Sequence, residues 1–512
     1  MVTARLIICI ILINSGFIAL VYMSRPASEY HRMFLSEQTP RWKAHILIAL
    51  VWVTLCCTTP MGLSPIQNGE RPGYRNQYEL IAEAFLKGQL YFDYEVDEKL
   101  AALENPYDGD ARRAAGVYYR WDHAFYKGKY YMYFGVVPVI LLFLPYRAIT
   151  GTSLATFHGS QIFAAFFILG VFALFKMLAG RFFSKLTLSG YLSLSIAVSV
   201  MSVWQVTVKP ALYCTAMISA ICMSIWSIYF FVKAVFCTES VNKAMVYAAL
   251  GSLFGAFEFG CRPTVGLSNV IVLPLLIYFL QHHKVDKKLV LKLVCAALPY
   301  VIVAAALMWY NAVRFDNPFE FGQSYQLTVA DQSGYSNMLS RIHPGEILDG
   351  IRYYLLDFRT PAELVTIGTL IVFPIHLIAV IWGMQKEPRR LLRESGLMPF
   401  VLFIPAAVLL IIFFIVVWSP VVAPRYRVDF FYLLGIMSFI LLGSVCEASG
   451  RSAGKSTGQS IRTSFRICVL AVLTVVASII VATYPYKGNN SDYYVKTYQK
   501  QSAESQENAE EP

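Results

Sequence analysis

Long apolar runs alternate with short polar connections along almost the entire chain. A helix needs about 20 apolar residues to cross the hydrocarbon core of a bilayer, and the longer runs approach that length. The thirteen candidate runs are residues 4–23, 44–60, 131–149, 156–178, 186–203, 211–235, 244–259, 265–281, 291–311, 363–384, 397–418, 430–447 and 467–485. In lipid, every backbone polar group needs an internal partner, so this pattern predicts an all-α polytopic membrane protein.

The charge of the connections indicates which runs cross, because Lys and Arg collect in short cytoplasmic loops. Five connections are strongly basic: 25–43, 181–185, 282–292, 386–393 and 451–466. If all thirteen runs crossed, the first connection would lie opposite the other four. The weakest intervening run is 131–149, which is interrupted at Gly135, Pro138, Pro145 and Arg147. We therefore predict an interfacial or re-entrant helix there, and about 12 transmembrane helices (range roughly 11 to 13) plus extracytoplasmic juxtamembrane helices.

This topology divides the chain into parts and places the N-terminus outside. The outer polar segments are 61–155, 312–362, 419–429 and 486–512. The expected parts are an extra N-terminal transmembrane helix with its cytoplasmic loop (1–43), a core containing the outer segment 61–155 (44–311), a second outer segment (312–362), C-terminal transmembrane helices (363–485), and an outer, largely disordered tail (486–512).

The composition agrees with a membrane protein, since 57% of the residues are hydrophobic and 15% are charged. The net charge of +11 is explained by inner loops that face anionic lipid, so nucleic acid is not needed as a partner. No GxGxxG, Walker or GxSxG arrangement occurs, which leaves nucleotide binding and serine hydrolysis without support. A soluble nucleotide-sugar donor is therefore not expected.

The outer segment 61–155 carries the densest polar chemistry of the chain. Residues 76–90 predict an amphipathic helix with an apolar stripe of Tyr78, Ile81, Ala82, Phe85 and Leu86, which ends at Gly88. This helix is suited to lying on the membrane surface. Farther on, residues 119–138 place aromatic side chains around four polar ones, Asp122, His123, Lys127 and Lys129. Those aromatics would also fit a plain interfacial belt.

Several motifs occur in a fixed order and on one predicted side. An acidic outer loop precedes a surface helix ending in Gly, and a Lys-aromatic-aromatic run leads into a Pro-containing interfacial helix. Later come CRPT at 261–264, FDNPFEFGQSYQ at 315–326 and APRYRVDF at 423–430. This order resembles the GT-C glycosyltransferases, above all the branch of the protein O-mannosyltransferases and the lipid A aminoarabinose transferase. The likeness runs through most of the chain, with residues 4–23 as an N-terminal extra.

The resemblance implies a GT-C-like fold and a membrane glycosyltransferase. Such an enzyme takes a sugar from a polyprenyl-phosphate donor and gives it to a cell-envelope acceptor, a glycan, lipid or protein, on the extracytoplasmic face. It would be a multi-pass protein of the plasma membrane, with undecaprenyl phosphate as the carrier if the cell is bacterial. The chemistry needs a carboxylate to accept the acceptor's proton, cations for the departing phosphate, and a lipid-facing groove.

The family places an acidic residue just before the first surface helix, whereas this chain has YRNQ at 74–77. The nearest acids are Asp122, which we favour as the catalytic base, and Glu79 as the second candidate. The alternative is structural for both. Glu79 would then lie on a solvated helix face, and Asp122 would cap a turn or pair with Lys127.

Arginines on the outer side are candidates for the donor phosphate, because planar guanidinium groups match phosphate oxygens. The predicted phosphate-binding residues are Arg425, Arg427, Arg262, Lys127 and Lys129. Snorkelling to lipid headgroups is the alternative for such cations. We also expect Glu258 to pair with Arg262, four residues on. For the acceptor or sugar pocket we expect Tyr78, Trp121, His123, Tyr426, Glu320 and Tyr325.

The metal question and two rival functions stay open at this stage. A divalent cation, Mg²⁺ or Mn²⁺, would find hard oxygen ligands at Asp93, Asp97, Asp108 and Asp110, although a solvated acidic loop explains these residues equally. A transporter or flippase for a lipid-linked saccharide predicts internal repeats and midplane charges, which the sequence does not show. An O-antigen polymerase or ligase would concentrate its arginines in a large loop late in the chain, whereas this chain carries its polar residues early.

Overall fold

The computed structural model describes residues 2–35, 40–63, 77–208, 212–328, 331–333, 342–357, 368–419, 423–451 and 457–483. These residues are predominantly helical, which confirms the predicted all-α membrane class. Within the described residues, the sheet structure consists of one hairpin, β1 (Ala124–Tyr126) paired with β2 (Lys129–Tyr131), and a few isolated bridges.

Ten helices in the described part of the chain are long and apolar enough to cross a membrane. They are α2 (Pro40–Thr58), α7 (Thr156–Phe182), α8 (Leu188–Val208), α9 (Leu212–Phe236), α10 (Val241–Cys261), the continuous set α11 (Pro263–Gly266), η6 (Leu267–Ile271) and α12 (Val272–His282), then α13 (Lys287–Phe315), α18 (Leu397–Trp418), α19 (Val428–Arg451) and α20 (Thr457–Thr483).

The count is lower than the predicted 12. The first run forms the 22-residue helix α1 (Val2–Met23), which has the length of a span; its side chains are described only from Ile7 onward, so α1 is not among the ten. The run 363–384 does not form one helix, because α15 (Thr369–Val372) and α16 (Ile375–Gly383) are separated at Pro374, and residues 361–367 lie outside the described ranges. The weak run 131–149 does not span, as predicted, since it ends in a π-helical turn (Val139–Phe143) and α6 (Leu144–Thr150).

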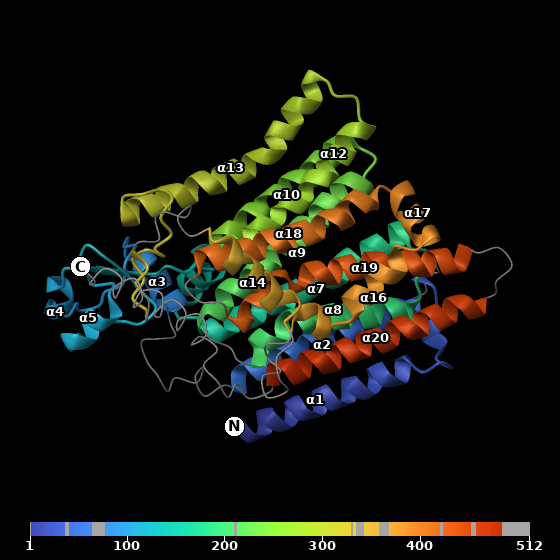
Figure 1. The fold of residues 1–512 in the computed structure, drawn as a ribbon, viewed down its shortest axis with the longest axis horizontal. Coiled ribbons are helices and arrows are strands. Elements are labelled where there is room, and N and C mark those ends of the chain that lie inside the picture. Colours follow the sequence, from blue (N-terminus) through green and yellow to red (C-terminus); the bar gives the residue numbers. More distant parts are fainter. Residues whose placement is uncertain are drawn as a thin grey trace, which may run out of the picture.

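The long helices lie roughly side by side, and the polar segments gather at their two ends (Figure 1). The helices α4 (Glu98–Ala102) and α5 (Gly109–Ala114) lie at one end, while α17 (Lys386–Glu394) and the turn from α12 to α13 lie at the other. The first two basic connections, 25–43 and 181–185, lie at the same end of the bundle. Backbone hydrogen bonds join them: Leu188 N donates to Met33 O at 2.7 Å, and Leu35 N donates to Leu186 O at 3.1 Å. This agrees with the predicted common side of these two basic loops.

Burial separates the central helices from those at the edge. The spans of α8 and α19 are almost wholly buried and form the centre of the bundle. In contrast, α13 is mostly exposed, contains Pro299 and stands apart from the bundle along part of its length (Figure 1). An exposed apolar helix of this kind faces the hydrocarbon of the bilayer.

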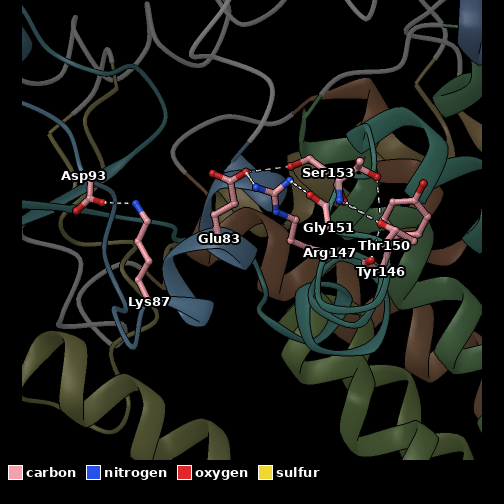
Figure 2. A network of polar contacts seen from close by, with 9 residues as sticks. Glu83, Lys87, Asp93, Tyr146, Arg147, Thr150, Gly151 and Ser153 are labelled. Atoms are coloured by element: carbon pink, nitrogen blue, oxygen red, sulfur yellow. Dashed lines mark hydrogen bonds and ion pairs between the residues drawn. The ribbon is translucent and has the colours of Figure 1, made fainter.

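The predicted amphipathic helix is present as α3 (Gln77–Leu86), and it packs on α6 and the π-helical turn before it. Tyr78 of its apolar stripe stacks on Phe134 and Phe143, with ring centroids 6.4 and 5.3 Å apart. Leu86 was predicted on the same stripe but is exposed, because the helix ends there. Figure 2 shows the polar link between the two helices, in which Arg147 of α6 lies 2.9 Å from Glu83 of α3.

The outer segment is docked closely onto the break between α10 and α11. A Cβ on Gly135 would lie 2.3 Å from the carbonyl oxygens of Gly260 and Cys261, so only glycine allows this approach. The motif CRPT makes the break, since α10 ends at Cys261 and Pro263 begins the next helix. Arg262 between them is extended, with φ −157°. The contact brings residues after β2 against the end of the bundle at which α10 stops.

Candidate functional site

A cavity of about 760 Å³ lies where the outer segment meets the ends of the long helices. Five residues predicted for catalysis or binding line it: Trp121, Asp122, Arg262, Arg425 and Tyr426. Much of the remaining wall is apolar and comes from α13, α18 and α20. Sequence positions more than 300 residues apart therefore share one chamber.

Asp122 is held in a backbone conformation that non-glycine residues rarely adopt. Its φ is +57°, in the left-handed region, where Asp is tolerated better than most side chains. Its N–H donates to Leu327 O at 3.1 Å, and its carbonyl oxygen accepts from Gln77 Nε2 at 3.0 Å. Its carboxylate Oδ1 accepts from Gln326 Nε2 at 2.9 Å. Backbone strain that is fixed by so many contacts is typical of functional sites.

The second outer segment supplies these contacts by pairing with the strand after Asp122. Leu327 N donates to His123 O at 2.9 Å, and Phe125 N donates to Tyr325 O at 2.9 Å. Ala124 and Gln326 form an antiparallel bridge. The motif at 315–326 is therefore part of the same site as the aromatic cluster around Asp122.

Glu79, the second candidate for the base, does not line the cavity. Its Oε1 accepts from the backbone N–H of Thr156 at 2.7 Å and from Thr156 Oγ1 at 3.2 Å. Thr156 is the first residue of α7, and the N–H groups of a first helical turn have no acceptor within the helix. The Glu79 carboxylate supplies that acceptor. Burial raises the pKa of Glu79. The geometry gives this residue a structural role.

We expect Glu79→Gln to leave catalysis unchanged, because the amide oxygen still accepts from Thr156 and the cavity is untouched. Glu79→Ala removes the acceptor and should lower the free energy of unfolding by about 1 kcal/mol, as for a lost helix cap. Transfer assays and thermal unfolding in detergent check the pair. Loss of turnover in a stably folded Glu79→Gln protein would contradict the structural role and make Glu79 a candidate for the catalytic base again.

Arg425 comes from a 3-10 turn, η10 (Pro424–Arg427), at the start of α19. Its guanidinium carbon lies 4.3 Å from the ring centroid of Tyr213 and 5.1 Å from that of Tyr426. In the described part of the chain no carboxylate forms an ion pair with it, and its buried Nε lacks a hydrogen-bond partner there. A cation held by aromatic faces at a cavity wall is well suited to an anionic ligand.

The charge of Arg262 is balanced by a carboxylate of the protein, that of Asp429. Its Nε lies 2.9 and 2.7 Å from the two carboxylate oxygens of Asp429, which also accepts from Thr264 Oγ1 at 3.0 Å. The predicted pair with Glu258 is therefore wrong: the Glu258 carboxylate accepts from Ser268 Oγ at 2.8 Å. The extended backbone of Arg262 turns its side chain out of the α10 helix, so the expected spacing of four residues no longer applies.

The other predicted phosphate ligands lie away from the cavity. Arg427 is buried beside the ring of Tyr353, because two residues of a 3-10 turn point to different sides. Lys127 pairs with Asp316 at 2.5 Å at the exposed tip of the hairpin, so it is not the partner of Asp122. Lys129 lies over the ring of Tyr91 at 4.1 Å. Neither lysine lines the cavity.

Four residues predicted for the sugar pocket do not line the cavity. Tyr78 and His123 are buried outside the cavity lining. His123 Nδ1 lies 2.8 Å from Trp121 O, and burial lowers the pKa of His123 to about 4, so the ring is neutral near pH 7. Glu320 accepts from Gly322 N at 2.6 Å and shapes a turn. Tyr325 packs on Tyr126, with ring centroids 4.5 Å apart.

The four acidic residues considered as metal ligands make local contacts within the protein. Asp93 pairs with Lys87 at 2.8 Å (Figure 2), and Asp97 and Asp108 accept from backbone N–H groups at the starts of α4 and α5. Asp110 forms an exposed pair with Arg113. Within the described residues, no group of three or more His, Cys, Asp and Glu side chains could hold a metal ion. The predicted acidic metal site is not formed by these ranges.

Several lining residues were missed from the sequence. Gln323, Gln326 and Gln332 form one wall, and their recurrence in a ten-residue stretch was the available signal. Tyr133 also lines the cavity, and it was missed because it is one of many aromatic residues at 119–138. Burial raises its pKa well above the usual range and the charge of Asp122 raises it further, while Arg425 acts in the opposite direction. This phenol therefore lies within electrostatic range of both the acid and the cation.

No family description matches this chain, and no curated protein matches it either. Similar solved structures include two of the oligosaccharyltransferase of Archaeoglobus fulgidus. The apo form has a TM-score of 0.47 and 14% identity over 86% of this chain and 57% of that one. The form tethered by a disulfide to an acceptor peptide with an NVT sequon has a TM-score of 0.42 and 12% identity over 88% and 56%. This chain thus spans little more than half the length of that protein.

Proposed function

We propose that the protein is a membrane glycosyltransferase that moves a sugar from a polyprenyl-phosphate donor to a cell-envelope acceptor on the outer face. The observation that carries the proposal is that Asp122 and Arg425 both line one cavity at the end of the helix bundle. A carboxylate and a cation on the walls of a chamber are the groups that displacement of a glycosyl phosphate requires.

Each group has one task in the proposed reaction. The carboxylate of Asp122 accepts the proton of the acceptor hydroxyl as its oxygen attacks the anomeric carbon of the donor sugar. The new bond joins the acceptor oxygen to that carbon, and the bond from the carbon to the phosphate oxygen breaks. The electron pair leaves with the phosphate, whose negative charge is balanced by the guanidinium of Arg425.

The apolar wall suits the lipid part of the donor. Leu307 of α13, together with Phe414 and Trp418 of α18, lines the cavity. Because α13 is largely exposed and stands at the edge of the bundle (Figure 1), the chamber borders on a lipid-facing helix. A polyprenyl chain could reach the cavity along this side without crossing water.

The location of the charges favours a transferase over a transporter. The ionisable side chains that line the cavity come from the ends of helices and from the outer segments, whereas a transport pathway places such groups near the membrane midplane. The acid comes from an early segment and Arg425 from a late one. This differs from the late arginine-rich loop that we associated with a polymerase or ligase.

The test is transfer of radiolabelled sugar from a panel of polyprenyl-phosphate sugars by the purified full-length protein in liposomes. We expect consumption of at least one donor and release of polyprenyl phosphate. Label that changes leaflet without donor consumption would replace the transferase with a transporter. Products that grow by repeated units would indicate a polymerase.

A further inference from the structure

Three glutamine side chains form a hydrogen-bonded chain along the cavity wall that ends on Asp122. Gln326 Nε2 donates to Asp122 Oδ1 at 2.9 Å, and Gln332 Nε2 donates to Gln326 Oε1 at 3.1 Å. Gln323 Nε2 donates in turn to Gln332 Oε1. All four residues line the cavity.

The ionised acid fixes the orientation of all three amides. A carboxylate only accepts hydrogen bonds, so Gln326 must present its NH₂ group to Asp122. Its carbonyl then faces Gln332, which must present its own NH₂ group, and the same step repeats at Gln323. The orientation of an amide is usually assigned from its network, and here each assignment follows from the one before it. The chain ends in the carbonyl oxygen of Gln323, a hydrogen-bond acceptor.

The charged side chains that line the cavity in the described ranges are Asp122 and three arginines, Arg262, Arg314 and Arg425. Among the described lining residues, Asp122 is the one carboxylate. The Arg314 guanidinium, which also lines the cavity, is engaged by the protein, because Nη1 donates to Met132 O at 2.6 Å and Nη2 to Asn311 Oδ1 at 2.8 Å. Arg262 is paired with Asp429, as described above.

We infer that the wall of Trp121, Gln323, Gln326 and Gln332 is the sugar subsite, and that it selects an uncharged, hydroxyl-rich sugar over an amino sugar or a uronic acid. Amides offer both donors and acceptors to hydroxyl groups, and an indole ring covers the apolar face of a sugar. This inference rests on the proposed function, because the donor must place its sugar beside Asp122 and its phosphate at Arg425.

Charged sugars would disturb the same wall. An ammonium group would pair with Asp122, the one carboxylate among the described lining residues, and Asp122 could then not act as the base. A uronic carboxylate would lie beside the charge of Asp122, and the repulsion would favour protonation of one of the two acids. Either charged group would therefore disturb the arrangement of Asp122 and the glutamine amides, which is the physical basis of the selection.

The experiment measures binding of four lipids to the full-length protein in nanodiscs, so that no acceptor is needed. The lipids are polyprenyl phosphate carrying an uncharged hexose, an amino sugar, a uronic acid, or no sugar. We expect the hexose lipid to bind about tenfold or more tightly than either charged lipid, because a charged group must be desolvated and would also break hydrogen bonds of the glutamine chain. It should also bind more tightly than the bare carrier.

A substitution tests the subsite directly. Gln323→Glu places a carboxylate of nearly the same shape at the end of the chain, where it can no longer donate to Gln332 Oε1. The hexose lipid should therefore lose affinity, while the amino-sugar lipid should gain about tenfold from the new carboxylate. The control is Gln459→Glu, which makes the same change on an exposed side chain in the first turn of α20, whereas the cavity is lined by the last turn of that helix. It should change neither affinity.

The outcomes separate this inference from the proposed function. If the hexose and amino-sugar lipids bind equally to the wild type, or if the hexose adds nothing to the bare carrier, the subsite is overturned while a lipid-phosphate donor remains. If none of the four lipids binds, the proposed function itself fails. The wild-type comparison needs no variant, so misfolding of Gln323→Glu cannot obscure the result.

Discussion

Replacement of Asp122 by Asn is expected to lower turnover about 10²- to 10⁴-fold, the usual contribution of a positioned general base. Asn has nearly the same shape and tolerates the left-handed conformation that Asp122 adopts, so the turn should form as before. Its side-chain oxygen can still accept from Gln326 Nε2. The change therefore removes the proton acceptor and preserves its surroundings. Single-turnover transfer from a saturating polyprenyl-phosphate sugar measures the effect.

The matched control is Asp110→Asn, in the same outer segment and highly exposed. It should leave turnover unchanged. Donor binding to Asp122→Asn should stay near the wild-type value, because the phosphate partner is Arg425. A wild-type rate in Asp122→Asn would contradict the proposed base, and equal losses in both Asn variants would point to a general effect of charge on the outer face.

Most of the membrane helices could be predicted from local pattern. Apolar length indicated the spans, and interruption by Gly and Pro correctly excluded 131–149 as a span. Asp122 could be chosen because an acid within an aromatic cluster stands out against solvated acids. Glu79, by contrast, was equally compatible with a helix face, and only the position of Thr156, 77 residues later, decided its role.

What could not be predicted depends on contacts between distant segments. The chain of glutamines reaches Asp122 across about 200 residues of sequence, and the recurrence of glutamine at 323, 326 and 332 does not by itself indicate which residue these side chains contact. Arg425 and Arg427 look equivalent in the motif APRYRVDF. The 3-10 turn that separates them into a cavity residue and a buried neighbour of Tyr353 follows from tertiary packing.

The cavity is lined by residues from interrupted helices. α10 stops at Cys261 and places the extended Arg262 at the wall, and η10 precedes α19 and places Arg425 there. The break after Cys261 and the 3-10 turn before α19 let these two arginines leave the direction of the helix and face the cavity. Departures from regular structure at these two motifs are therefore consistent with a functional site rather than with poor helix-forming sequence.

Replacement of Arg425 by Ala is expected to weaken binding of a polyprenyl-phosphate sugar at least about 30-fold, since loss of one partner of a desolvated charge pair costs roughly 2 kcal/mol or more. In the described residues no carboxylate pairs with Arg425, so its removal leaves no acid uncompensated and the fold should persist. Arg425→Lys should recover part of the affinity through its charge, but not the planar geometry. Arg113→Ala removes an exposed arginine from the outer segment and should have no effect. Unchanged donor affinity in a folded Arg425→Ala protein would refute the phosphate role, and the proposed reaction would then need a different cation.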